Sequence, residues 1–157
     1  ARFKTKKIIM KKISKHISYK EAVRSDYAKK HKIENEPNDE QLENMQLIAE
    51  KVFEPLREWV GGPIKVNSFF RSEELNTGIK GSLTSQHLKG QAIDLTTMGL
   101  KTNLEIFNYI KDNLDFDQVI WEYGRKNPVW IHVSYKPKNN RKQALIIKEV
   151  GQYKIYK

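Results

Sequence analysis

Three segments of the chain carry the signals of helices. The longest runs from Leu42 to Leu56 and repeats apolar residues every three or four positions, which predicts an amphipathic helix packed on a core. Residues 104–114 show the same spacing and predict another helix. Ser18 with Glu21 three positions later is a capping-box pair, so we expect a helix from Tyr19 to about Lys30.

The rest of the chain reads differently, because its apolar runs are short and bounded by turn residues. Such runs predict strands over 64–70, 92–96, 118–123, 129–135, 145–150 and 153–156. The last four runs predict two hairpins, since glycine and proline separate the members of the first pair and Gly151 separates those of the second. The polar stretch 72–86 predicts a loop. Helices followed by a mainly antiparallel sheet make an α+β fold.

Length, cysteine content and charge narrow the class of protein. A chain of 157 residues is the size of one domain with its own core. It has no cysteine, which excludes disulfides and thiolate metal sites, and no apolar run long enough for a membrane-spanning helix. The net charge of +10 favours anionic partners, either a nucleic acid or an anionic bacterial envelope. A lysine-rich surface that is merely solvated fits the charge equally well.

By composition the chain divides into three parts. Residues 1–15 form a basic N-terminal arm, in which Ile8–Met10 could be a strand. Residues 16–136 form the main domain, and residues 137–157 form a basic C-terminal extension that contains the last predicted hairpin. The apolar run in the arm is too short for a signal peptide, so we expect any leader to lie outside this sequence.

The candidate chemistry is concentrated around two histidines and one aspartate. His87 and Asp94 stand seven positions apart, with Asp94 inside an apolar run, and His132 follows on a predicted strand. Two imidazoles and a carboxylate are the protein ligands of many catalytic zinc sites. A buried aspartate needs a compensating cation, which a lysine or arginine could supply instead of a metal. A strand histidine, taken alone, is often only a satisfied core residue.

Taken together, these residues resemble the D-alanyl-D-alanine carboxypeptidase and phage cell-wall endopeptidase family of zinc peptidases. The resemblance covers most of the chain and rests on an arginine loop at Asn67–Ser72, on the S-x-H-x(6)-D element at Ser85, His87 and Asp94, and on the late His132. It implies the hedgehog/DD-peptidase fold, with N-terminal helices packed on the sheet. It also implies a Zn²⁺ cofactor held by His87, Asp94 and His132.

The same resemblance implies a substrate-binding and catalytic role for Arg71. The planar fork of its guanidinium suits a substrate carboxylate or carbonyl. Ser85 and Gln86 are candidates for hydrogen bonds to the substrate or to the zinc ligands, and Trp130 is a candidate for the cleft wall. For Arg71, Ser85 and Gln86 the alternative is a purely local role in their loops.

The position of the general base departs from the family pattern. Many relatives carry an acid three positions before the last histidine, where this chain has Val129, which cannot accept a proton. If the two flanking strands pair as a hairpin, Glu122 lies nearly opposite Trp130, on the face that Trp130 shares with His132. Glu122 is therefore the candidate base. A slip of one residue would turn it away, and an ion pair with Arg125 or another cation is the alternative.

The resemblance implies a zinc metallopeptidase that cuts the stem or cross-link peptide of bacterial peptidoglycan at a D-amino-acid bond, as a carboxypeptidase or an endopeptidase. We expect it at the bacterial envelope, held on the anionic wall by its charge, or as a phage virion or lysis enzyme. One alternative is a zinc-containing wall-binding module without catalysis, which Val129 favours. Another is a basic nucleic-acid-binding domain, which no helix-turn-helix or aromatic RNA-binding signature supports.

Overall fold

The structure, a computed structural model, describes residues 11–157. The predicted strand at Ile8–Met10 and most of the predicted basic arm lie outside that range, and the bounds of the three predicted parts stay predictions. Within residues 11–157, no helix combines the length and the apolar character that crossing a membrane requires.

Most of the helices precede the larger sheet. They are α2 (Tyr19–Ala22), α3 (Asp26–Lys30), α4 (Asp39–Ile48), the π-helical turn η1 (Ala49–Phe53), α5 (Glu54–Val60), α6 (Glu73–Gly78), the 3₁₀ turn η2 (Gln86–Lys89) and α7 (Asn103–Asn113). The predicted helices at 42–56 and 104–114 are confirmed, and both begin at a side chain that caps the first turn, Asn38 for α4 and Thr102 for α7.

The single helix predicted from Tyr19 to Lys30 is wrong, because the chain breaks between α2 and α3. Ser25 is extended, and its hydroxyl accepts a hydrogen bond from the N–H of Ala28 at 3.1 Å. A serine that caps a new helix in this way competes with continuation of the previous one. The predicted loop 72–86 is also interrupted, since Ser72 caps α6 in the same manner.

Six strands form one sheet in the order β3-β4-β6-β5-β7-β8. They are β3 (Ile64–Ser68), β4 (Ala92–Thr97), β5 (Gln118–Glu122), β6 (Trp130–Ser134), β7 (Gln143–Ile147) and β8 (Tyr153–Ile155). Neighbouring strands are antiparallel, except that β7 runs parallel to β5. A separate pair, β1 (Lys12–Ser14) and β2 (Ile17–Ser18), lies near the N-terminal end of the described chain. The α+β class with a mainly antiparallel sheet is confirmed.

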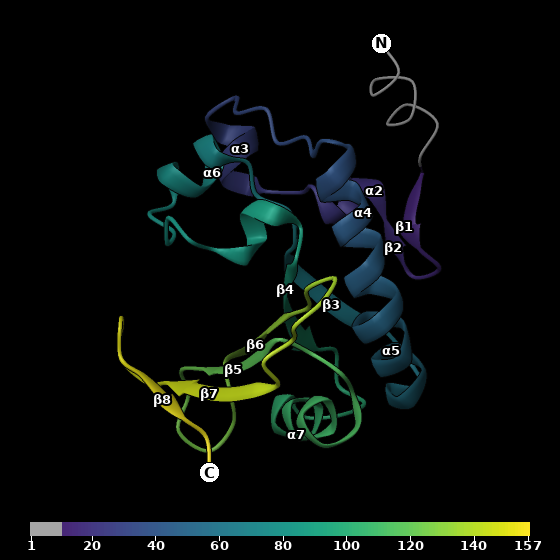
Figure 1. Cartoon of the computed structure of the whole chain (residues 1–157), viewed down its shortest axis with the longest axis vertical. Coiled ribbons are helices and arrows are strands. Elements are labelled where there is room, and N and C mark those ends of the chain that lie inside the picture. Colours follow the sequence, from purple (N-terminus) through teal and green to yellow (C-terminus); the bar gives the residue numbers. More distant parts are fainter. Residues whose placement is uncertain (1–10) are drawn as a thin grey trace.

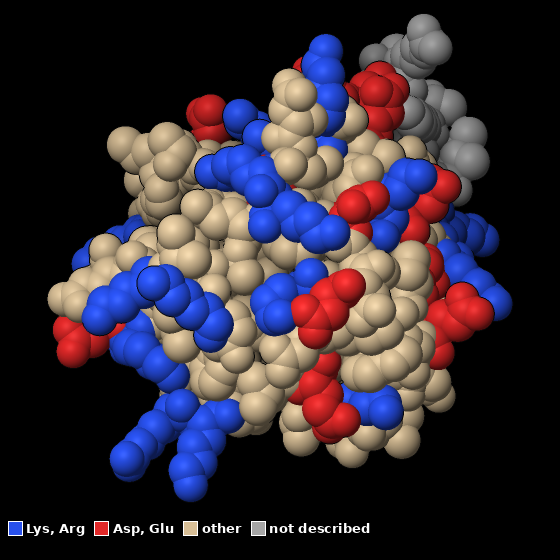
Figure 2. All heavy atoms as spheres, turned by 60° about the horizontal axis from the view of Figure 1, so that its bottom comes forward, with Lys and Arg blue, Asp and Glu red and all other residues tan. Residues whose placement is uncertain are grey.

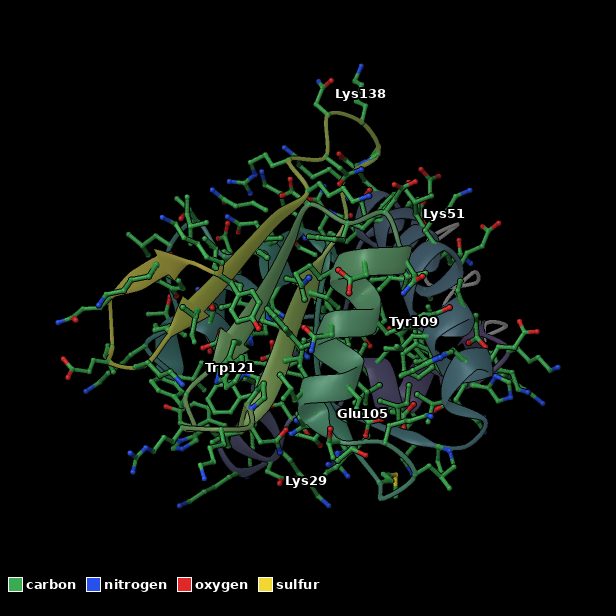
Figure 3. All side chains as sticks on the ribbon, turned by 90° about the horizontal axis from the view of Figure 1, so that it is seen from below. Lys29, Lys51, Glu105, Tyr109, Trp121 and Lys138 are labelled. Atoms are coloured by element: carbon green, nitrogen blue, oxygen red, sulfur yellow. The ribbon has the colours of Figure 1, made fainter. Side chains whose placement is uncertain are left out.

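Helices cover one face of the larger sheet. The rod formed by α4, η1 and α5 stands beside β3 and β4, and α7 lies under β5 and β6 (Figure 1). Figure 3, seen from below, shows α7 in front of the strands, with Trp121 of β5 beside it. The core between these layers includes Phe53, Phe107, Ile93, Leu95, Ile131 and Val133. Because side chains alternate along a strand, Asp94 and His132 project from the opposite face.

Candidate functional site

The strand register brings the candidate residues onto one face of the sheet. Asp94 of β4 is opposite His132 of β6, and Glu122 of β5 is opposite Trp130 of β6. The predicted pairing of Glu122 with Trp130 is therefore confirmed. Since residues two apart on a strand share a face, Asp94, His132 and Glu122 all project to the side away from the helical core.

His87 reaches the same place from the 3₁₀ turn η2. The Ser85 hydroxyl accepts a hydrogen bond from the His87 N–H at 3.3 Å, and Gly90 ends the turn in the left-handed conformation. The imidazole is only 2% exposed, and its Nδ1 lies 2.7 Å from the carbonyl oxygen of Phe69. A carbonyl oxygen can only accept, so Nδ1 donates and Nε2 is left with a free lone pair.

His87, Asp94 and His132 form a compact group whose ligand atoms all lie within 4.8 Å of one another. One oxygen of Asp94, Oδ1, is 3.2 Å from His87 Nε2 and 3.0 Å from His132 Nδ1. Burial lowers the pKa of His87. Burial alone would raise the pKa of Asp94, but the two imidazoles outweigh it and hold the pKa well below its usual range. A neutral imidazole at His87 and an ionised carboxylate at Asp94 are forms that bind metal ions, so the group fits a metal.

Arg71 lies beside this group, on the loop that follows β3. Its Nη2 donates to Asp94 Oδ2 at 3.3 Å, and its Nε donates to the Ser68 hydroxyl at 3.0 Å. The backbone around it is tied to the site as well, since the Arg71 N–H donates to the carbonyl oxygen of His87 at 3.2 Å. Asp94 thus uses one oxygen for the imidazoles and the other for an arginine, so the salt bridge that was the alternative to a metal exists alongside the metal-binding geometry.

Glu122 lines the same cavity as the three candidate ligands. Burial raises the pKa of Glu122 to about 7. The charged groups that act on it are His132, Asp94 and Arg71, rather than Arg125 as the alternative reading expected. A carboxyl that changes protonation near neutral pH, in the same cavity as the candidate ligands, is suited to proton transfer.

Val129 stands outside this arrangement. Its side chain is 54% exposed, and it precedes the first residue of β6. The carboxylate that this chain brings to the candidate ligands therefore comes from β5, the strand next to β6.

The other predicted substrate-binding residues also line the cavity, but two of them have structural contacts. Ser85 caps η2, as described above, and Gln86 Nε2 donates to Asp117 Oδ2 at 3.1 Å. Trp130 contributes its ring, whose centroid lies 5.3 Å from that of Tyr123. The cavity they share has a volume of about 790 Å³, within the range of small-molecule and peptide sites.

Sequence reasoning missed Asp117, which is completely buried immediately before β5. Its carboxylate accepts hydrogen bonds from Arg141 Nε at 3.0 Å and Nη2 at 2.7 Å, and Lys136 Nζ lies 3.5 Å away. It also missed the part of the cavity built by β7 and β8. The sequence signal for that part was the pair of short runs split by Gly151 that predicts the last hairpin, and this signal does not reveal the strand that the hairpin joins.

Comparisons with known proteins agree with this geometry at the level of the family. No curated protein matches the chain. The family described as Peptidase M15 matches residues 15–134, which is more than half of the chain and contains His87, Asp94, His132, Arg71 and Glu122. The chain therefore belongs to the Peptidase M15 family of metallopeptidases.

Proposed function

We propose that the protein is a zinc-dependent peptidase that hydrolyses the stem or cross-link peptide of bacterial peptidoglycan, at a bond involving a D-amino acid. It would act as a carboxypeptidase or an endopeptidase. One observation carries the catalytic part of this proposal: Glu122, with a pKa raised to about 7, lines the same cavity as His87, Asp94 and His132. The family supplies the substrate class.

In this proposal Zn²⁺ is held by His87, Asp94 and His132, a nitrogen and oxygen ligand set that leaves room for further ligands. Bound zinc lowers the pKa of a water molecule and polarises a carbonyl group. The hydrogen bond from His87 Nδ1 to Phe69 fixes the ring so that Nε2 faces Asp94. Fixing the tautomer in this way strengthens metal binding.

Glu122 is the general base, which takes a proton from the attacking water and returns it to the leaving amine. Arg71 orients the substrate through a carboxylate or carbonyl oxygen, while its bonds to Ser68 and Asp94 keep the guanidinium in place. Ser85 and Gln86 lie on the wall beside His87, and Trp130 forms the wall beside Glu122. These three complete the proposed substrate-binding surface.

The basic surface suits the anionic cell wall as the larger partner. The net charge is +10. Lys and Arg side chains gather over the left part of the face in Figure 2, the side on which β7 and β8 lie in Figure 1. Attraction of this kind raises the local concentration of an enzyme on its substrate. A place at the bacterial envelope, or in a phage virion or lysis enzyme, is part of the same proposal.

The test is digestion of purified peptidoglycan of several chemotypes, with the released fragments identified by mass spectrometry. Cleavage at one D-amino-acid bond, dependent on added zinc and lost in Glu122→Gln, is the expected result. Zinc binding and wall binding without release of any fragment would instead support the wall-binding module. If the protein binds neither zinc nor the wall, the proposal is refuted altogether.

A further inference from the structure

The cavity that holds the candidate ligands continues across the sheet as far as its last strand. Four side chains form one row on the site face: His132 is opposite Ile120, Ile120 is opposite Leu145, and Leu145 is opposite Ile155. A second row runs from Glu122 through Ile147 to Tyr153. Ile120, Leu145, Tyr153 and Ile155 line the same cavity as His132 and Glu122. The floor is therefore catalytic at one end and apolar at the other.

The apolar end is exposed although the strand that carries it is firmly attached. Ile155 is 65% exposed and Tyr153 is 56% exposed. The neighbouring Tyr156 anchors β8, since its N–H donates to Ala144 at 2.9 Å and its ring packs edge-on against Phe107 at 5.0 Å. Exposed apolar side chains on an anchored strand, inside a cavity, are available to bind an apolar group.

The length of the row sets the size of the group that fits. From His132 to Ile155 there are three strand spacings, or about 14 Å at the usual separation of about 4.8 Å. An extended peptide covers that distance in about four residues. A substrate that is cut beside His132 would therefore reach Ile155 with a residue about four positions away.

We infer that β7 and β8 form an extended subsite for one limb of the substrate peptide, with an aliphatic side chain of the substrate bound over Tyr153 and Ile155. The inference rests on the proposed peptidase function for the position of the scissile bond. It makes the enzyme selective for long peptides over dipeptides. The segment responsible, residues 143–155, lies beyond the part of the chain that matches the family.

Binding to the zinc-loaded Glu122→Gln variant tests this subsite without relying on turnover. The probes are synthetic peptides with a D-Ala-D-Ala unit, lengthened by one to four residues on either side and ending in leucine or serine. In one of the two series, we expect the four-residue leucine peptide to bind about five- to tenfold more tightly than its serine counterpart, from burial of one aliphatic side chain. Ile155→Ser, added to this variant, should remove that preference.

Lys154→Ser is the matched control, because Lys154 lies on the same strand between Tyr153 and Ile155 and points to the other face. It should keep the leucine preference. The subsite is refuted if neither series of peptides shows a preference for leucine. It is also refuted if Ile155→Ser leaves the leucine preference unchanged while Lys154→Ser removes it. Hydrolysis of the same peptides by the wild type is measured separately. Cleavage without any leucine preference refutes the subsite alone. A leucine preference in binding, without cleavage, refutes the proposed function alone.

Discussion

Glu122 has the three properties that a general base for peptide hydrolysis needs. Its carboxyl lines the cavity of the candidate ligands, its pKa of about 7 lets it gain and lose a proton near neutral pH, and the charged groups that act on this pKa belong to the site itself. The position follows from the register of β5 against β6, in which Glu122 faces Trp130.

Glu122→Gln should separate metal binding from catalysis. The amide keeps the shape of the side chain but cannot accept the proton, so we expect zinc to stay bound while kcat falls about 10²–10⁴-fold. Zinc content by elemental analysis and kcat on wall fragments are measured on the same sample. Glu50→Gln, at an exposed carboxylate in η1, is the control and should behave like the wild type. A Glu122→Gln variant with full zinc and full activity would show that the base lies elsewhere.

Substitutions of Arg71 should distinguish its charge from its shape. Lysine keeps the charge but cannot donate to Ser68 and Asp94 as a planar fork, so Arg71→Lys should lose activity, and Arg71→Ala should lose more. A loss of about tenfold or more in kcat/KM is expected for Arg71→Lys, corresponding to one charge-assisted hydrogen bond. Steady-state kinetics on wall fragments provide the measurement. Unchanged kcat/KM in Arg71→Ala contradicts the assignment.

At the scale of residues, the sequence contained enough to bring the candidate ligands and Glu122 together. The spacing of His87 and Asp94 and the alternation along β5 and β6 are local properties, and the structure follows them. The partners of Gln86 and Asp117 were not predictable, because their hydrogen bond joins positions 31 residues apart, and the course of the chain between them depends on the whole fold.

At the scale of elements, Gly90 fixes the turn that carries His87. Its φ is +71°, and a Cβ there would lie 2.5 Å from the carbonyl oxygen of Gln41 and 2.7 Å from Met45 Cγ. Any other residue would be strained in this left-handed conformation and would also push η2 away from α4.

Gly90→Ala should therefore cost both stability and metal affinity. Gly61 is the matched control, since its φ is +77° but a Cβ there would have no neighbour within 4 Å. We expect Gly61→Ala to lower the free energy of unfolding by about 1–2 kcal/mol, from conformational strain alone. Gly90→Ala should lower it further and weaken zinc binding, which Gly61→Ala should leave unchanged. Urea denaturation and zinc titration measure the two effects, and equal behaviour of the two variants would contradict this role for Gly90.

The two long helices and most strands were predictable because their signals are local, but the pairing of β7 was not. The apolar runs at 145–150 and 153–156, separated by Gly151, predict a hairpin wherever it lies in the fold. Nothing within 143–155 indicates that β7 would run parallel to β5, since that pairing depends on a connection that leaves β6 and passes β5. The outer half of the cavity depends on this long-range pairing, and so escaped prediction.

At the scale of the whole molecule, Asp117 joins segments that are far apart in the sequence. Its buried carboxylate connects the start of β5 to Arg141 in the loop before β7 and to Gln86 beside His87. Figure 3 shows that the same loop carries Lys138 at its exposed end. Burial opposes ionisation of Asp117, but the hydrogen bonds from Arg141 outweigh it and lower the pKa to about 2.

This pKa predicts how stability should depend on pH. A carboxyl whose pKa is lower in the folded state than in the unfolded chain, where it is about 4, stabilises the fold at pH values above 4. Its contribution should be lost as the pH falls from about 4 to about 2. Asp117→Asn should reduce stability at pH 7 and flatten this part of the profile, as measured by urea denaturation at several pH values. If the stability of Asp117→Asn is lower at every pH but falls as steeply as that of the wild type between about pH 4 and about pH 2, the prediction is contradicted.

Metal binding should stabilise the molecule as a whole, because its proposed ligands come from η2, β4 and β6 and meet only when all three are folded. A ligand that binds only the folded state adds about 4 kcal/mol at a free concentration of about 1,000 times its Kd. For a domain of this size that corresponds to a rise in Tm of about 10 °C. Chelation should remove the rise, and added zinc should restore it. His132→Ala should abolish the response, whereas His31→Ala, at an exposed histidine, should retain it. Calorimetry with and without zinc tests whether these three residues bind the metal. If the Tm of the wild type does not respond to zinc, or if the Tm of His132→Ala responds equally, any bound metal lies outside this group.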